Sequence, residues 1–70
     1  MFDNIERVFI NRKARVELWL SEKMYKQWIF LANQELDMNN LSGSVKCLKR
    51  ANEMIKIQTG LRFIINRTDA

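Results

Sequence analysis

The chain has 70 residues, which make one domain at most, and its single cysteine excludes an internal disulfide. It contains no histidine, so the residues that most often hold a metal or act as a catalytic base are missing, and we expect no metal, no cofactor and no enzymatic activity. The net charge of +4 favours an anionic partner, and no apolar run approaches the ~20 residues that span a bilayer, so we expect a cytoplasmic protein that does not enter a membrane.

The first element is a short N-terminal helix. Asp3 and Glu6 form a D-x-x-E capping box, which favours a helix over residues 4 to 9 or 10. A competing interpretation makes residues 7–10 a strand that pairs with residues 15–20 across a turn at 11–14, but that turn lacks glycine. Residues 1–13 are therefore expected to be a helical or hairpin extension of the domain.

The hydrophobic period then changes within residues 15–32. From Arg15 to Leu20 apolar and other residues alternate, which is typical of a half-buried strand. Ser21 breaks the alternation and is a natural N-cap for a helix from Glu22 to about Gln34 or Leu36. The apolar residues of this helix recur at three- and four-residue steps: Met24, Tyr25, Trp28, Leu31 and Ala32.

A turn and a further helix follow. Turn and cap residues cluster between Glu35 and Gly43, so we expect the chain to reverse there, with Ser42 or Ser44 capping the next helix. Its expected apolar face consists of Val45, Leu48, Ala51 or Met54, and Ile55. Gly60 is expected to end this helix, and residues 61–65 could form a further strand or a last helical turn.

Residues 16–32 resemble the ribbon-helix-helix family, the Arc and MetJ type of repressor. The family pattern is an alternating strand, a Pro or Ser, two polar residues, an aliphatic-aromatic pair, two polar residues, a large apolar residue and a Leu-Ala pair. Those places are held here by VELWL at 16–20, Ser21, EK at 22–23, MY at 24–25, KQ at 26–27, Trp28, and LA at 31–32. The resemblance implies a mostly α fold with one short strand, in an intertwined homodimer whose core is residues 14–57, with residues 58–70 as a C-terminal extension.

The resemblance also implies a function, that of a transcriptional regulator binding double-stranded DNA. Two strands pair into a ribbon in the major groove, and here the outward residues would be Arg15, Glu17 and Trp19. Glu17 repels phosphates and Trp19 is bulky, which weakens this assignment. Phosphate contacts would come from the basic Arg12 and Lys13 and from the start of the second family helix: Ser42, Gly43, Ser44 and Lys46.

An all-α alternative stays open, in which the chain is a two-helix hairpin that acts as an adaptor or inhibitor binding a protein partner. Residues 3–36 would then be one long helix with Trp19 and Phe30 as interface anchors. Its apolar stripe would consist of Ile5, Phe9, Val16, Leu20, Met24, Trp28 and Leu31. With either fold, about 47% hydrophobic residues in so short a chain suggest surface buried between chains, most simply in a twofold dimer.

Overall fold

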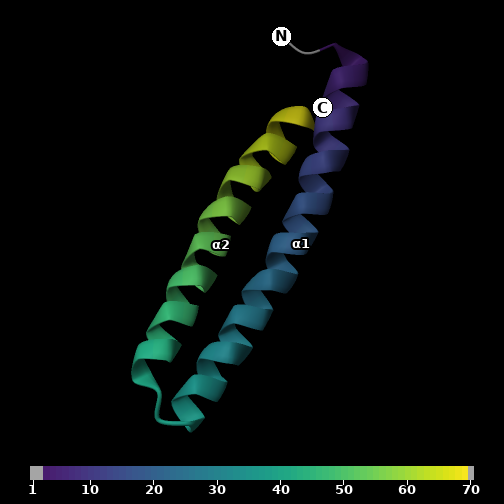
Figure 1. Cartoon of the computed structure of the whole chain (residues 1–70). Helices are drawn as coiled ribbons and strands as arrows, with labels where there is room; N and C mark the ends of the chain where they lie inside the picture. Colours follow the sequence, from purple (N-terminus) through teal and green to yellow (C-terminus); the bar gives the residue numbers. More distant parts are fainter. Residues whose placement is uncertain (1–2, 70) are drawn as a thin grey trace.

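Two long antiparallel helices joined by a tight turn make up the structure, a computed structural model that describes residues 3–69. Helix α1 spans Asn4–Asp37 and helix α2 spans Leu41–Thr68, and the two lie side by side along most of their length (Figure 1). The principal-axis extents of 53, 15 and 13 Å describe a thin rod rather than a globule. The start of α1 projects past the end of α2 (Figure 1).

The predicted ribbon-helix-helix fold is wrong, because the described residues 3–69 contain no strand, and the all-α hairpin is the correct fold class. The segment predicted as a strand, residues 15–20, lies within α1. Its alternation is also compatible with a helix, since Val16 and Leu20 are four residues apart and therefore share one helical face. Ser21 does not cap a helix; its hydroxyl donates to the Leu18 carbonyl oxygen at 2.8 Å, one turn back in α1.

The predicted start of the first helix is confirmed, but its predicted end is not. The backbone N–H of Glu6 donates to the Asp3 side chain at 2.7 Å, so Asp3 caps α1 as the sequence indicates. The helix then continues for 34 residues instead of stopping at residue 9 or 10. The connector at residues 11–14 is helical, and the predicted extension over residues 1–13 is, from Asn4 onward, the first part of α1.

The reversal lies inside the stretch where turn residues cluster, and a different residue caps α2. Asn40, not Ser42 or Ser44, is the N-cap, and its side-chain oxygen accepts from the Gly43 N–H at 3.0 Å. The Asn40 amide also donates to the Glu35 carboxylate at 2.7 Å, which ties the two helix ends together. Asn39 has a φ of 58°, a left-handed conformation that asparagine tolerates better than most residues.

Gly60 lies inside α2 instead of ending it. Because glycine weakens the interior of a helix, replacing it is expected to stabilise the protein. A Cβ at Gly60 would meet no atom within 4 Å, and its φ is not positive. We expect Gly60→Ala to raise the free energy of unfolding by about 0.5–1 kcal/mol, because alanine has less backbone freedom to lose. Urea unfolding followed by circular dichroism measures this change.

Gly43→Ala is the matched control, because a Cβ there would lie 2.7 Å from the Asn40 side-chain nitrogen and 2.8 Å from a Glu35 carboxylate oxygen. We therefore expect this second variant to gain no stability. Equal gains from both variants would contradict the account of the turn.

The interface between the helices is formed by side chains at alternating three- and four-residue steps, and many of them are small or polar. We call these residues the seam. On α1 the seam consists of Arg7, Asn11, Ala14, Leu18, Ser21, Tyr25, Trp28, Ala32 and Glu35. On α2 it consists of Ser44, Cys47, Ala51, Met54, Gln58, Leu61, Ile65 and Thr68. Such steps are the heptad pattern of helices that pack at a shallow angle.

Most of the large apolar side chains in this seam are only partly buried. The buried hydrophobic residues are Ala14, Ala32, Ala51, Leu61 and Ile65. The face predicted to be apolar in the second family helix is mostly exposed, since Val45, Leu48 and Ile55 keep more than two fifths of their surface. The stripe predicted for a long first helix is likewise largely exposed: Ile5, Phe9, Val16, Leu20, Met24 and Leu31.

Polar contacts fix the register of the helices at the end where the chain termini lie. The Asn11 amide donates to the Thr68 hydroxyl at 2.9 Å and to the Asp69 carboxylate at 2.8 Å. Arg15 also pairs with Asp69, at 2.7 Å, and Arg62 lies 3.7 Å from Glu22 further along. These ion pairs are about half exposed, so each contributes only about 0–1 kcal/mol, but together they define which residues face one another.

Candidate functional site

The residues proposed for DNA contact fall into two groups far apart on the rod. Residues 12, 13, 15, 17 and 19 lie in the terminal half of α1, and residues 42, 43, 44 and 46 lie in the first turns of α2 beside the loop. From Trp19 to the end of α1 at Asp37 the helix rises by roughly 27 Å. The structure therefore does not bring the two groups together.

Several of these side chains already have structural roles. Arg15 binds Asp69 and also donates to the Asn11 side chain at 2.8 Å. The Gly43 N–H donates to the Asn40 side-chain oxygen, and Ser44 is buried in the seam with 1% of its surface exposed. Two of the residues expected to hold a phosphate therefore have other roles: Gly43 is part of the turn, and Ser44 is part of the seam.

Two buried polar atoms in the seam lack hydrogen-bond partners among the described residues, the Ser44 hydroxyl and the Gln58 amide nitrogen. A buried polar group without a partner lowers stability by about 1–3 kcal/mol. Within residues 3–69 no three His, Cys, Asp or Glu side chains gather to hold a metal ion. In the same range, neither helix has an apolar stretch long enough to cross a membrane.

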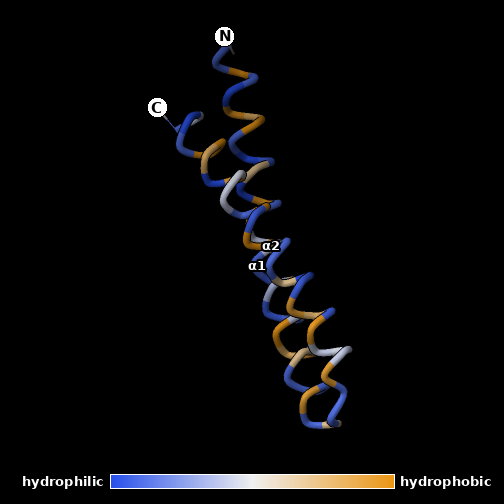
Figure 2. Tube along the Cα trace, turned by 90° about the vertical axis from the view of Figure 1, so that its left-hand side faces the viewer, coloured by the Kyte–Doolittle hydropathy of each residue, from blue (hydrophilic) through white to orange (hydrophobic). Residues whose placement is uncertain are grey.

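The outward side of α1 combines aromatic and cationic side chains. We call it the outer α1 face. It lies opposite the seam, between residues 9 and 30, and consists of three neighbouring sets of residues, each with seven-residue spacing along the helix. These are Phe9, Arg12, Lys13, Val16, Trp19, Leu20, Lys23, Lys26, Gln27 and Phe30. All ten are exposed, four carry a positive charge, and none carries a negative charge. Bands of hydrophobic residues follow α1 along its whole length (Figure 2).

Three aromatic rings stand out on this face. Phe9, Trp19 and Phe30 are 68%, 55% and 61% exposed, respectively. The Lys23 ammonium lies 4.5 Å from the centroid of the Trp19 ring, a cation–π contact that restricts the indole. A shallow depression of ≈ 350 Å³ beside Phe30 is also lined by Lys26, Gln27 and Leu31.

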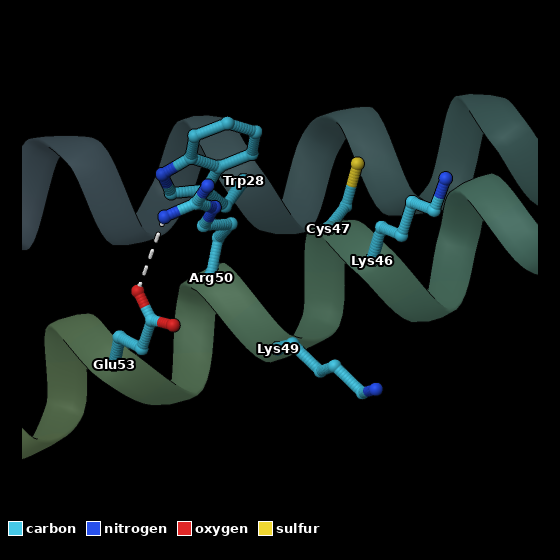
Figure 3. Close-up of a pocket in the computed structure, with 6 residues that line it drawn as sticks. All are labelled: Trp28, Lys46, Cys47, Lys49, Arg50 and Glu53. Atoms are coloured by element: carbon cyan, nitrogen blue, oxygen red, sulfur yellow. Dashed lines mark hydrogen bonds and ion pairs between the residues drawn. The ribbon is translucent and has the colours of Figure 1, made fainter.

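A second groove runs between the helices near the loop. It has a volume of ≈ 430 Å³ and is lined by Trp28, Lys46, Cys47, Lys49, Arg50 and Glu53. Arg50 is tied to Glu53 at 3.5 Å, and Lys49 extends away from the other side chains (Figure 3). Cys47, predicted to be a buried small hydrophobe, is only partly buried here. This groove places cations beside one indole, and its acid, Glu53, is paired with Arg50.

The outer α1 face was only partly identified from the sequence, which singled out Trp19 and Phe30 as anchors and Arg12 and Lys13 as basic residues. Lys23 and Lys26 were missed. A signal for Lys23 is the seven-residue spacing from Phe9 through Val16 and Lys23 to Phe30, which places these four residues on one line along the helix. No protein-family model, curated protein or solved structure matches the chain, so the assignment of this face depends on its geometry and chemistry alone.

Proposed function

We propose that the protein is a small helical adaptor or inhibitor that binds an acidic helical segment of a protein partner through the outer α1 face. The observation that carries the proposal is the composition of that face, in which four cations and five large apolar residues are exposed together without a single acid. A partner helix with an apolar stripe and flanking carboxylates complements both components.

The apolar residues of this face favour a protein over DNA as the partner. Phosphate contacts need only cations, and burying phenylalanine or leucine against a phosphate backbone gains nothing. Protein interfaces, in contrast, are enriched in aromatic residues, of which this face exposes three. The ribbon mechanism also requires a strand, whereas residues 15–20 are helical.

Trp19 is the expected centre of the contact. Large aromatic side chains dominate binding energy when they enter a pocket of the partner. The contact with Lys23 holds the indole in place before binding, so less conformational freedom is lost when the partner docks.

Site-specific photocrosslinking in the cells that produce the protein tests the proposal. With a photoreactive phenylalanine analogue at Phe30, we expect covalent adducts with one other protein, identified by mass spectrometry as an acidic helical segment. The matched control places the same analogue at Lys56, which lies on α2 opposite the seam. Equal adducts from both positions, or none with another protein, would contradict the proposal.

Binding of the identified segment should then depend on Trp19 and on charge. We expect Trp19→Ala to raise Kd by about 30-fold or more, because a central tryptophan is worth about 2 kcal/mol or more. Lys26→Glu should slow association and weaken its salt dependence. Isothermal titration calorimetry and stopped-flow fluorescence measure the two effects. Duplex DNA that binds more tightly than the peptide at low salt would instead favour a nucleic-acid partner.

A further inference from the structure

The hairpin exposes more surface than a chain of its mass should. It exposes 5706 Å², about 1,100 Å² more than the roughly 4,600 Å² expected for a globular monomer of 8.4 kDa. The Cα radius of gyration of 16.0 Å likewise exceeds the ~11 Å of a compact chain of this length. A standard interface buries about 800 Å² on each partner, so the excess is larger than the area that one docked chain of standard size covers.

The interhelical ion pairs show which residues of the two helices border the same side of the rod. Arg15 pairs with Asp69, and Glu22 pairs with Arg62. Arg15 and Glu22 belong to one column with seven-residue spacing on α1, and Arg62 and Asp69 belong to one such column on α2. On α1 the column continues from Glu22 to Ile29 and Leu36, and on α2 it runs back from Arg62 to residues 55, 48 and 41. Because the ion pairs join the columns, both columns border one side.

The two columns carry charged residues in the terminal half of the rod and aliphatic residues in the loop half. We call the aliphatic part the loop-end patch: Ile29, Leu36, Leu41, Val45, Leu48 and Ile55. Val45 belongs to it because it lies four residues after Leu41 and three before Leu48. Leu41 is 67% exposed and Leu48 is 47% exposed. Helical spacing in the sequence therefore marks a genuine apolar stripe on α2, but this stripe does not face α1.

We propose that a second copy of this chain covers the loop-end patch, through an isologous contact that joins two hairpins into a four-helix bundle. The patch consists of aliphatic residues, and the exposed Asn33 and Asn52 that lie between its members at helical spacing are uncharged, so two copies can pack without opposing like charges. Self-association through the outer α1 face would instead oppose its four cations to those of another chain. Small proteins are often stabilised by disulfides or bound zinc, and a chain with one cysteine and no histidine can form neither within itself. Oligomerisation is another common source of this stability.

Sedimentation equilibrium at micromolar concentrations tests the proposal. We expect the wild-type chain to sediment with twice the 8.4 kDa mass of one chain. Leu48→Glu should raise the dissociation constant of the dimer by about 100-fold or more, because a twofold contact places the buried charge in the interface twice. Val45→Glu should have the same effect, and both variants should keep the helical circular dichroism of the wild type.

Ile57→Glu is the matched control, because Ile57 is also on α2 and 48% exposed but lies two positions beyond Ile55, outside the paired columns. The dissociation constant of its dimer should stay within about threefold of the wild-type value, as expected for a residue outside the interface. A monomeric wild type, or equal disruption by Ile57→Glu and Leu48→Glu, would overturn the proposal. Neither result affects crosslinking from Phe30, so the two proposals can fail separately.

Discussion

Leu61→Ala is expected to lower the free energy of unfolding by about 2–5 kcal/mol, the usual loss when a buried leucine is truncated. Leu61 is 7% exposed and forms the main hydrophobic cluster with Ala14 and Ile65, against which Leu18 packs. The rest of the seam has few large apolar residues to compensate for a cavity here. Since small proteins are stable by only about 5–15 kcal/mol, this one change removes a large share of the total.

Urea unfolding at a fixed protein concentration, followed by circular dichroism, measures the effect. The concentration must be fixed because a dimer gains stability by mass action. The control is Ile57→Ala, which removes a similar volume from a residue that is 48% exposed and should cost less than about 1 kcal/mol. Similar losses in the two variants would mean that Ile57 is covered in solution and that the seam is not the main source of stability.

The ends of the helices could be predicted from the sequence because short-range chemistry determines them. Asp3 and Glu6 are three residues apart, and the expected cap forms between them. The reversal before Gly43 was also predicted, although the capping side chain is Asn40 rather than a serine. In both places the decisive contacts join residues at most five apart, so local patterns contain the information.

The seam could be predicted only in part by following the large hydrophobic residues: Tyr25 and Trp28 of the predicted helical face lie in it, but this chain leaves many other large hydrophobic residues exposed. Val16, Leu18 and Leu20 alternate and so indicated a strand, while Ser21 resembled a cap. In the structure Ser21 is 5% exposed in the seam and Val16 is 58% exposed. The seam follows small residues such as Ala14 and Ser21, seven positions apart, whose low hydrophobicity gives a weak signal.

The proposed binding face was obscured for the same reason. When large apolar residues are assigned to a core, the exposed ones are not recognised as a binding surface. Gln58 shows the complementary case, a polar residue 8% exposed in the seam. Its burial weakens the hairpin but disfavours other registers, as a polar residue at a heptad position does in coiled coils. The seam thus buries little large apolar surface, while large hydrophobic residues stay exposed outside it and are available for the contacts proposed above.

Ala51→Leu tests whether the small residues of the seam are needed for close approach of the helices. Ala51 is 2% exposed, so three extra carbons there must push the helices apart or force strained side-chain conformations. We expect a loss of about 1–3 kcal/mol in the free energy of unfolding, although leucine is more hydrophobic. The same urea experiment measures the loss.

The control for this variant is Lys56→Leu, because it adds a leucine at an exposed position of the same helix, opposite the seam and outside the loop-end patch. It should change the stability by no more than about 0.5 kcal/mol. If Ala51→Leu instead stabilised the protein, the helices would be far enough apart in solution to admit a large side chain. The seam would then be an ordinary apolar core with unfilled space, and the exposure of the large hydrophobic residues would need another cause. A loss confined to Ala51→Leu means that alanine at this position sets the spacing of the helices, which leaves the larger residues to bind other chains.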